Sequence, residues 1–499
     1  MSIDLLQAAR ELIAIDSRSS VSDRAVVDYL APLCRRAGLT VHLQTERRDG
    51  VEQHNLLAGR GGSATTAGGA AAGPAVAAER PALLLATHLD TVPPGDEALW
   101  TQTGGDPFRL TERGGLLVGL GSADVKLDFL CKLVALERLA ETPLQRPVLL
   151  AGTYGEEVGR WGARLLLRET APLPAAVLVG EATGLRPCTA HKGFLELRCT
   201  ARAATQPAPA GHCRRITFHG ASAHSSQVHK GVSANDACLD TLQSLSAPTP
   251  PVVLDLQGGD LVNKVADRAE MIMVGPTALD DAAFRRSRRA GDDSPQVGPA
   301  IPGPAVVDMP CPEHATWSPQ LVTLLLALHR HVAALRADLL LDQVAGFEPP
   351  YSTVNNGLVS LTAGELSYTI DVRSVPGDAA AERLATHLKR IDQLAEQTAD
   401  CELRIERVQD DPPFAAMPGS PLLHSLHGVL RDHRLPVDPE LKSGTTEAAQ
   451  YRDAGLDVLV FGPGEAAGNI HRPNEHVPLA HLRRAVDVYE AMVRRLCGG

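Results

Sequence analysis

The chain has 499 residues, of which 44% are hydrophobic and 3% aromatic, and its formal net charge is -11. This length predicts two domains, or one domain with a large insertion. The excess of acidic residues argues against a nucleic-acid backbone or an anionic membrane as the main partner, because both attract basic surfaces.

The nine cysteines are scattered and never form a Cys-x-x-Cys pair, which favours reduced thiols in a cytosol over a disulfide framework. The N-terminal residues have charges between apolar side chains, unlike the continuous apolar core of a signal peptide. No window approaches the roughly 20 apolar residues of a membrane span. These features predict a soluble, cytoplasmic protein.

Helices and strands alternate in the first part of the chain. Amphipathic patterns predict helices over 3–15 and 22–37, and apolar runs predict strands over 55–59 and 81–87. The Gly/Ala-rich tract 61–78 between these strands is expected to be an exposed loop or insertion. The pattern continues with a helix over 125–140, a strand over 147–153, a helix over 161–169 and a strand over 175–180. This rhythm predicts an α/β sheet domain.

Between about 190 and 376 the pattern changes to alternating strands, such as 194–199 and 366–373, with helices over 233–245 and 318–336. The Arg/Gly/Pro-rich piece 284–305 is expected to be a mobile loop. The α/β rhythm returns with a strand over 456–462 and a closing helix over 478–497. We therefore expect a sheet domain formed by residues 1–190 and 377–499, with an α+β domain of residues 191–376 inserted into it.

Five short segments place metal-type ligands next to predicted strands, at the edge where α/β sheets bind ligands. The segments carry His88 with Asp90, Asp124, Glu156 with Glu157, Glu181, and His471. Each has an ordinary alternative when taken alone, such as a surface histidine, a helix-capping aspartate or a pair of solvated acids. Together they can supply ligands to two divalent ions with one carboxylate bridging, and such two-metal clamps serve hydrolysis.

This series resembles the M20 family of zinc peptidases and deacylases, which includes acetylornithine deacetylase, succinyl-diaminopimelate desuccinylase, carboxypeptidase G and the aminoacylases. The motifs that carry the resemblance are His88-Leu-Asp90, Gly-Ser-Ala-Asp124, Glu156-Glu157, Gly-Glu181-Ala-Thr and His471. The resemblance implies a di-zinc aminopeptidase-like catalytic domain, with a central mixed, mostly parallel sheet flanked by helices, and an inserted lid of 191–376. It also implies two divalent ions, zinc first, with cobalt or manganese as alternatives.

The family pattern also implies a role for each matching residue. It assigns five metal ligands: a bridging Asp124, His88 and Glu181 on one ion, and Glu157 and His471 on the other. Glu156 would be the general acid and base, and Asp90 would orient the imidazole of His88. The Asp124–Val125 peptide bond would be cis.

The segment 218–226 resembles the lid segment in which this family places a histidine against the oxyanion of the reaction, and His224 is the candidate. A histidine in a serine-rich turn is the alternative. Residues Ser443, Gly444 and Thr445 lie in a stretch that resembles the substrate-gripping loop of the family. The Thr-Glu-Ala that follows is closer to acetylornithine deacetylases than to desuccinylases, whereas Leu-Asp after Lys126 departs from the family's small residue.

In compact dimeric relatives, one lid strand pair carries an Asn for the substrate and, 13 residues later, an Arg for its carboxylate. This sequence contains that unit twice: Asn263 is followed by Pro276 in the Arg position, and Arg373 is preceded by Ser360 in the Asn position. These complementary losses predict a duplicated lid and an enzyme that functions as a monomer, with a homodimer as the alternative. A strand-end salt bridge is the alternative role for Arg373.

The sequence thus predicts metal-dependent hydrolysis of the amide bond of a small N-acyl amino acid, as in acetylornithine deacetylases, with Glu156 activating the attacking water. A dipeptidase or carboxypeptidase of the same family is the runner-up, because the doubled lid is typical of the dipeptidase branch. A non-catalytic metal-binding protein would have no use for the extra acid Glu156. A nucleotide-binding protein is disfavoured because the glycine turn at 119–122 lacks a Lys-Ser/Thr sequence.

Overall fold

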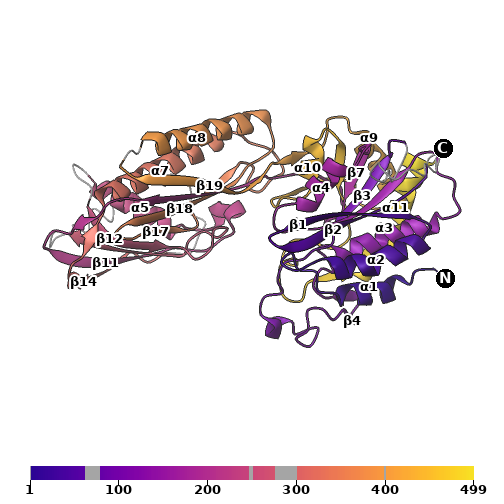
Figure 1. The fold of residues 1–499 in the computed structure, drawn as a ribbon, viewed down its shortest axis with the longest axis horizontal. Coiled ribbons are helices and arrows are strands. Elements are labelled where there is room, and N and C mark those ends of the chain that lie inside the picture. Colours follow the sequence, from indigo (N-terminus) through magenta and orange to yellow (C-terminus); the bar gives the residue numbers. More distant parts are fainter. Residues whose placement is uncertain (1, 62–78, 247–250, 276–300, 398–399, 499) are drawn as a thin grey trace. The chain divides into compact units, whose positions relative to one another are not determined.

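The computed structural model describes residues 2–61, 79–246, 251–275, 301–397 and 400–498. The chain divides into two compact units (Figure 1). Unit 1 comprises Met1–Ala190, Phe414–Lys442 and Thr446–Gly499, and unit 2 comprises His191–Pro413 and Ser443–Thr445. The predicted loop at 61–78 and most of the one at 284–305 lie outside the described residues.

Unit 1 contains a nine-stranded mixed sheet. Its spatial order is β1 (Thr40–Arg48), β2 (Val51–Arg60), β6 (Val148–Thr153), β3 (Leu83–His88), β7 (Ala176–Val179), β22 (Asp457–Val460), β8 (Cys188–His191) and β20 (Phe414–Ala415), with β21 (Glu440–Lys442) paired to β8. The four central strands β6, β3, β7 and β22 are parallel, and β1, β2 and β8 pair antiparallel. A small second sheet joins β23 (His476–Pro478), β5 (Leu116–Val118) and β4 (Thr111–Arg113).

Helices cover both faces of the unit 1 sheet, which confirms the predicted α/β class. One face packs against α1 (Leu5–Ile13), α2 (Arg24–Arg36), α3 (Lys126–Arg138), α9 (Pro421–Asp432) and α11 (Leu479–Cys497), and the other against α4 (Trp161–Glu169) and α10 (Ala448–Asp453). In β3, Leu83 and Leu85 belong to the first core whereas Leu84 and Ala86 belong to the second. Successive side chains of a strand point to opposite faces, so a strand covered on both sides is apolar throughout.

Unit 2 contains a second nine-stranded sheet, whose strand pairs are antiparallel. Its order is β14 (Ala305–Met309), β11 (His212–His219), β13 (Arg268–Gly275), β12 (Val252–Gly258), β17 (Val359–Leu361), β18 (Glu365–Arg373), β9 (Phe194–Arg202) and β19 (Glu402–Asp411), with β16 (Thr353–Asn355) paired to β18. Helices α5 (Ala234–Leu245), α7 (Pro319–Leu339) and α8 (Asp378–Gln397) pack on one face of this sheet (Figure 1). The other face carries polar side chains such as Glu196 and Arg198 of β9.

The chain leaves unit 1 after Ala190, and it returns at Phe414 rather than at residue 377, where the sequence pattern had placed the boundary. Helix α8 and strand β19 belong to unit 2, because β19 pairs along its length with β9 and α8 packs against β19. A helix followed by a strand gives the same local pattern in either unit. Only the long-range pairing of β19 decides between them.

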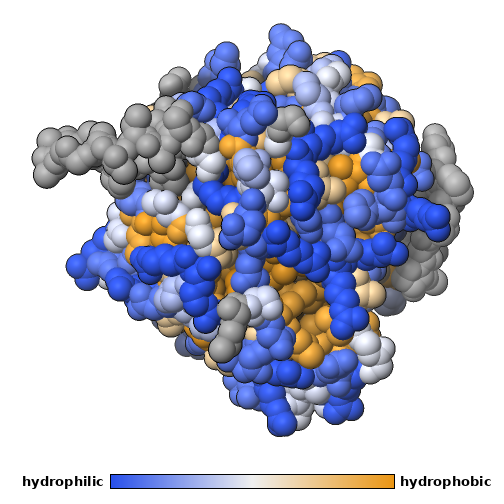
Figure 2. Space-filling view, turned by 90° about the vertical axis from the view of Figure 1, so that its right-hand side faces the viewer, coloured by the Kyte–Doolittle hydropathy of each residue, from blue (hydrophilic) through white to orange (hydrophobic). Residues whose placement is uncertain are grey.

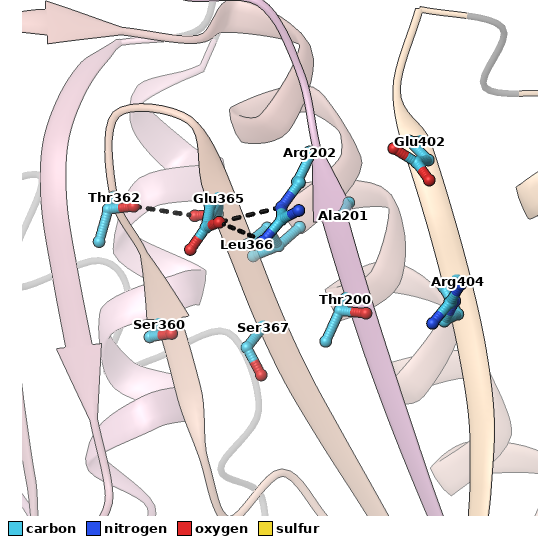
Figure 3. A pocket seen from close by; sticks show the side chains of 10 residues that line it. All are labelled: Thr200, Ala201, Arg202, Ser360, Thr362, Glu365, Leu366, Ser367, Glu402 and Arg404. Atoms are coloured by element: carbon cyan, nitrogen blue, oxygen red, sulfur yellow. Dashed lines mark hydrogen bonds and ion pairs between the residues drawn. The ribbon is translucent and has the colours of Figure 1, made fainter.

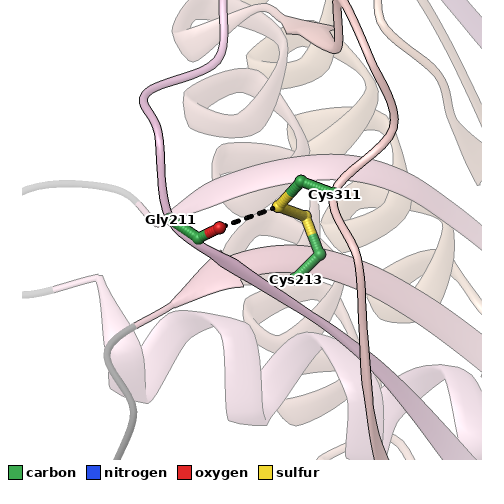
Figure 4. Close-up of a disulfide and its surroundings, with 3 residues drawn as sticks. All are labelled: Gly211, Cys213 and Cys311. Atoms are coloured by element: carbon green, nitrogen blue, oxygen red, sulfur yellow. Dashed lines mark hydrogen bonds between the residues drawn. A yellow bond between two sulfur atoms is a disulfide. The ribbon is translucent and has the colours of Figure 1, made fainter.

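Cys213 and Cys311 form a disulfide in unit 2 (Figure 4), which corrects the expectation that all the cysteines are reduced. They lie 98 positions apart in the sequence. The pairing of β11 with β14 brings them together, so no local spacing could have revealed the bond. The other seven cysteines are free thiols.

The surface drawn in Figure 2 is mostly hydrophilic, with hydrophobic residues in patches between the polar ones. Among the described residues, no helix combines the length and the apolar character that a membrane crossing requires.

Candidate metal centre

Three neighbouring strands of unit 1 deliver four of the predicted site residues. Strands β6, β3 and β7 lie side by side and parallel, so their carboxyl ends meet at one edge of the sheet. His88 is the last residue of β3, Glu156 and Glu157 follow β6, and Glu181 follows β7. The edge therefore gathers one imidazole and three carboxylates from segments far apart in the sequence.

Asp124 joins this edge between two histidines. Its Oδ1 lies 3.2 Å from Nε2 of His88, and its Oδ2 lies 3.1 Å from Nε2 of His471. Nε2 of His471 also lies 3.3 Å from Oε2 of Glu157. The two oxygens of one carboxylate thus face two different imidazoles. The Asp124–Val125 peptide bond is cis, as the family pattern implied.

The ligand-type atoms form three overlapping sets, each within 4.8 Å: His88 with Asp124 and Glu181, Asp124 with Glu157 and His471, and His88 with Glu156 and Glu157. The first two sets contain the same residues as the two ion sites expected from the sequence, and they share Asp124. Carboxylate oxygens and imidazole nitrogens suit zinc and similar divalent ions. The donor set of this edge therefore fits two ions with a common bridging carboxylate.

The pKa values at this edge reflect how crowded the charges are. Burial raises the pKa of Glu156 well above its usual range, and the charges of Glu157 and Glu181 act in the same direction. For Asp124, burial is outweighed by hydrogen bonds from His471 and His88, which hold its pKa below the usual range. Asp124 is therefore ionised between the two imidazoles.

Asp90 has a broader positioning role than the sequence predicted. Nδ1 of His88 lies 3.0 Å from the carbonyl oxygen of Asp90, but 3.6 Å from its carboxylate. The carboxylate instead accepts hydrogen bonds from the backbone N–H groups of Glu156 (3.0 Å) and Glu157 (3.3 Å), and from the hydroxyl of Ser19 (2.6 Å). One buried acid thus ties the end of β3 to the turn that carries both glutamates.

Glu156 is buried and lies 3.2 Å from Nε of Arg160. Arg160 comes from the same turn as Glu156, and the sequence pattern did not indicate this contact. The guanidinium of Arg160 binds Oε1 of Glu156. This charged hydrogen bond holds the side chain of Glu156 in one orientation.

Glu475 is a further residue that sequence reasoning missed. Its buried carboxylate accepts backbone N–H bonds from Gly121 (3.2 Å), Ala123 (2.8 Å) and Asp124 (2.9 Å). Burial raises the pKa of Glu475 to about 8. It shapes the turn that presents Asp124. Its only sequence signal was its position four residues after His471, which does not distinguish it from a solvated acid.

Two residues of the 442–448 stretch also reach this edge. Nζ of Lys442 lies 2.9 Å from Oε2 of Glu181. Glu447 is fully buried and accepts a hydrogen bond of 2.9 Å from the hydroxyl of Thr153, and burial raises its pKa to about 7. The sequence pattern marked this stretch for substrate contacts, and it did not indicate these two contacts within unit 1.

Leu127 and Asp128, which follow Lys126, replace the small residue usual in the family, and Asp128 has a partner in the same helix. Asp128 pairs with Lys132 at 2.6 Å, both fully buried in α3. Nζ of Lys132 also donates to the carbonyl oxygen of Ala86 (2.7 Å) and lies 2.8 Å from Oγ1 of Thr87. The ion pair thus holds the end of β3, just before His88.

The predicted lid residues lie in unit 2. Nδ1 of His224 accepts the backbone N–H of Ser226 at 3.1 Å, which assigns the proton of a neutral imidazole to Nε2. His224 and Asn263 are exposed neighbours, because the N–H of Ser225 donates to the carbonyl oxygen of Asn263 at 3.0 Å. The segments that carry His224 and Asn263 thus lie side by side in unit 2.

Arg373 forms a salt bridge at the end of β18, which was the alternative to a substrate-binding role. It is 6% exposed, lies over the ring of Phe194 at 3.5 Å, and pairs with Asp371 through Nε (2.8 Å) and Nη2 (3.2 Å). It also stands opposite Thr353, whose hydroxyl donates to the carbonyl oxygen of Ser225. The ion pair with Asp371 occupies one edge of the guanidinium group, and the ring of Phe194 covers one of its faces.

Residues Ser443, Gly444 and Thr445 are partly buried or exposed and belong to unit 2. A separate polar pocket of unit 2 (Figure 3) contains none of the predicted site residues. Strands β9, β17, β18 and β19 and their ends line it, with Arg202 and Glu365 forming an ion pair at its wall. Its side chains are mainly hydroxyls and exposed charges, without a metal-type cluster.

Comparisons with known proteins place the chain in a family. A model of peptidase family M20/M25/M40 matches residues 84–495. An acetylornithine deacetylase from Myxococcus xanthus is 26% identical over 517 aligned positions, covering 99% of both chains. Another, from Proteus mirabilis, is 32% identical over 287 residues. This match covers 54% of the present chain and 64% of that relative, which is less than two thirds of its length.

Solved structures share the fold. An aminoacylhistidine dipeptidase from Vibrio alginolyticus matches with a TM-score of 0.68 at 16% identity, covering 99% of this chain and 96% of that one. An M20 family metallo-carboxypeptidase from Sulfolobus solfataricus matches with a TM-score of 0.56 at 14% identity, covering 99% of both chains. The resemblance drawn from the motifs is confirmed by the family match over most of the chain. The chain therefore belongs to peptidase family M20/M25/M40, a family of hydrolytic enzymes.

Proposed function

We propose that this protein is a metal-dependent amidohydrolase that removes the acyl group from a small N-acyl amino acid. The observation that carries the proposal is the position of Asp124, whose two carboxylate oxygens face the imidazoles of His88 and His471 separately. A carboxylate placed in this way is suited to bridging two ions. The proposed ions are zinc, and cobalt or manganese would suit the same donors.

In this proposal, His88, Asp124 and Glu181 hold one ion, and Asp124, Glu157 and His471 hold the other. Such a pair of ions supplies an acidified water and a polarised substrate carbonyl when bound. Glu156 takes a proton from the attacking water and returns it to the leaving amine. Asp90 keeps Glu156 and Glu157 in place through their backbone N–H groups.

Unit 2 supplies the proposed substrate contacts. A protonated Nε2 makes His224 a hydrogen-bond donor suited to the oxyanion. Asn263, Arg373 and residues 443–445 are the candidates for the substrate's other polar groups. For Arg373 this role competes with the ion pair to Asp371.

The acyl amino acid is favoured over a dipeptide because the relative matched along both full lengths is an acetylornithine deacetylase. A small molecule is the proposed partner, without nucleic acid or membrane, and a cytoplasmic location remains our prediction. The disulfide weighs against that location, because disulfides are rare in reducing compartments.

The test is a hydrolysis screen of the zinc-loaded protein against N-acetylornithine, other N-acetyl and N-succinyl amino acids, and several dipeptides. The metal content of the same sample is measured in parallel. We expect about two ions per chain and the highest kcat/KM on an N-acyl amino acid. Higher turnover of dipeptides would replace the deacylase by a dipeptidase. Two bound ions without turnover of any of these substrates would favour a non-catalytic protein.

A further inference from the structure

Lys442 places a fixed positive charge on one proposed metal ligand. It is the last residue of β21, which pairs with β8, and its Nζ lies 2.9 Å from Oε2 of Glu181. Both side chains are largely shielded, with 9% of Lys442 and 5% of Glu181 exposed. A contact between two buried charges is stronger than the same contact at the surface, because water screens it less.

Glu181 belongs to only one of the two proposed ion sites. It completes the set with His88 and Asp124, whereas the set of Asp124, Glu157 and His471 does not include it. The ammonium group therefore contacts one site directly. In the second set, the basic neighbour of the carboxylates is His471, which is itself a proposed ligand.

Two physical consequences follow for the Glu181 site. The bond to Lys442 engages one lone pair of Oε2, so Lys442 competes with an ion for this oxygen, whereas it has no such bond to Oε1. A lysine ammonium this close to a ligand also repels a divalent cation, with an energy that grows as the surroundings become less polar. Both effects lower the affinity of this site relative to its neighbour.

We propose that Lys442 makes the two ion sites unequal, so that the site of Asp124, Glu157 and His471 fills first and the Glu181 site fills only at higher metal concentration. This inference rests on the proposed function, because it requires two ions. Lys442 acts as a positioning residue that orients the carboxylate of Glu181 and competes with an ion for its Oε2. The protein would then switch between one-ion and two-ion forms according to metal supply.

The test is a titration of the full-length, chelator-stripped protein with zinc against a competing chelator, repeated with cobalt and its visible absorption. The wild type should show two steps separated by at least about tenfold in affinity. Lys442→Met, which keeps the length of the side chain without its charge, should tighten the weaker step by about tenfold or more and leave the stronger step unchanged. Lys442→Arg, which keeps the charge, should retain two separate steps.

Lys230→Met is the matched control, because it removes a lysine charge from the surface of unit 2, where Lys230 pairs with Glu348. It should leave both steps unchanged. Lys442→Gln serves if Lys442→Met fails to fold. Unchanged affinities in the charge-removing variant, or loss of the weaker ion, would overturn the inference.

The outcomes separate this inference from the proposed function. Two ions with equal affinities in the wild type would refute only the role of Lys442. Two unequal ions without hydrolysis of any substrate would refute only the hydrolase. A protein that binds no ions would refute both.

Discussion

The acids of the candidate metal centre are chemically similar but have different neighbours, and these neighbours suit them to different proposed tasks. Asp124 lies between two histidines, Glu156 lies beside Arg160, and Asp90 accepts two backbone N–H groups. Glu475 accepts three more from the turn of Asp124. Each task can be tested by removing one charge at a time.

Replacing Glu156 by Gln should lower kcat/KM by a factor on the order of 100 to 10,000, because general acid–base catalysis contributes that much. The metal content should stay at the wild-type value, since the proposed ligands are other residues. Glu157→Gln is the matched control and should lower the metal content instead. Wild-type activity in Glu156→Gln would remove Glu156 from the proton transfer.

Replacing Asp90 by Ala should lower metal affinity or kcat/KM by about 10- to 100-fold, the usual effect of residues that orient metal ligands. The cause would be loss of the acceptor for the N–H groups of Glu156 and Glu157. Ser19→Ala removes only the hydroxyl that binds the same carboxylate, so its effect should be smaller. Equal effects of the two variants would show that the backbone contacts do not matter.

Glu447 should make stability depend on pH. Its pKa is 4.5 ordinarily and about 7 in the folded chain because of burial. Between these values the folded state keeps the proton and the unfolded state has lost it, so raising the pH favours unfolding. The slope is up to about 1.4 kcal/mol per pH unit.

The contribution of Glu447 is therefore complete below pH 4.5 and lost above about pH 7. Denaturant unfolding from pH 4 to pH 8 should show this fall in the free energy of unfolding for the wild type. In Glu447→Gln, residue 447 cannot ionise. The fall in the free energy of unfolding should therefore be smaller than in the wild type by the contribution of Glu447. Identical pH profiles would show that the buried carboxyl is not protonated in the folded chain.

At the scale of elements, the ends of the parallel strands explain where the candidate site lies, and an edge strand explains where the disulfide lies. The parallel strands β6, β3 and β7 end together at the candidate metal centre. In unit 2, β14 forms one edge of the sheet, and its pairing with β11 brings Cys311 next to Cys213. The bond closes a long loop at this edge, so it limits the freedom of the unfolded chain.

Removing this bond by Cys213→Ser should lower the stability of unit 2 by about 2–5 kcal/mol, the usual cost of losing a native disulfide. Trp317 is the tryptophan of unit 2, and its fluorescence can follow the unfolding of this unit. Dithiothreitol should destabilise the wild type and leave Cys213→Ser unchanged. Cys401→Ser, which removes a free thiol of the same unit, should still respond to the reductant.

At the scale of the whole molecule, the internal arrangement of unit 2 bears on the oligomeric state. Strands β12 and β17 pair antiparallel in the middle of its sheet, each followed by an antiparallel partner, β13 and β18. The duplicated lid stays a prediction: it expects two such hairpins side by side, and the two hairpins here differ in length. A lid that contains both halves has no need of a second chain.

Sedimentation should therefore give a single species near the chain mass of 52.9 kDa. Full activity at concentrations where any dimer has dissociated would agree with it. A protein that is active only as a dimer, with its activity lost on dilution and restored by mixing His224→Ala with Glu156→Gln subunits, would contradict the duplicated lid.

Much of the fold could be predicted because its signals are local. The strand 81–87 is apolar throughout, which marks burial on both faces, and helices such as 161–169 carry their own periodicity. The boundary near residue 377 could not be predicted, because β19 is assigned only by its pairing with β9.

The sequence by itself determined which residues are candidates for the metal centre, because each follows a predicted strand or turn and stands in a motif that resembles a metal-binding motif of the family. The tertiary structure alone decided how they are held. The two histidines on Asp124, the backbone bonds to Asp90 and Glu475, and the ammonium of Lys442 on Glu181 all join residues that are distant in the chain. Residue type and local spacing carry the chemistry of a ligand, whereas its orientation and charge balance depend on contacts that exist only after the strands pair.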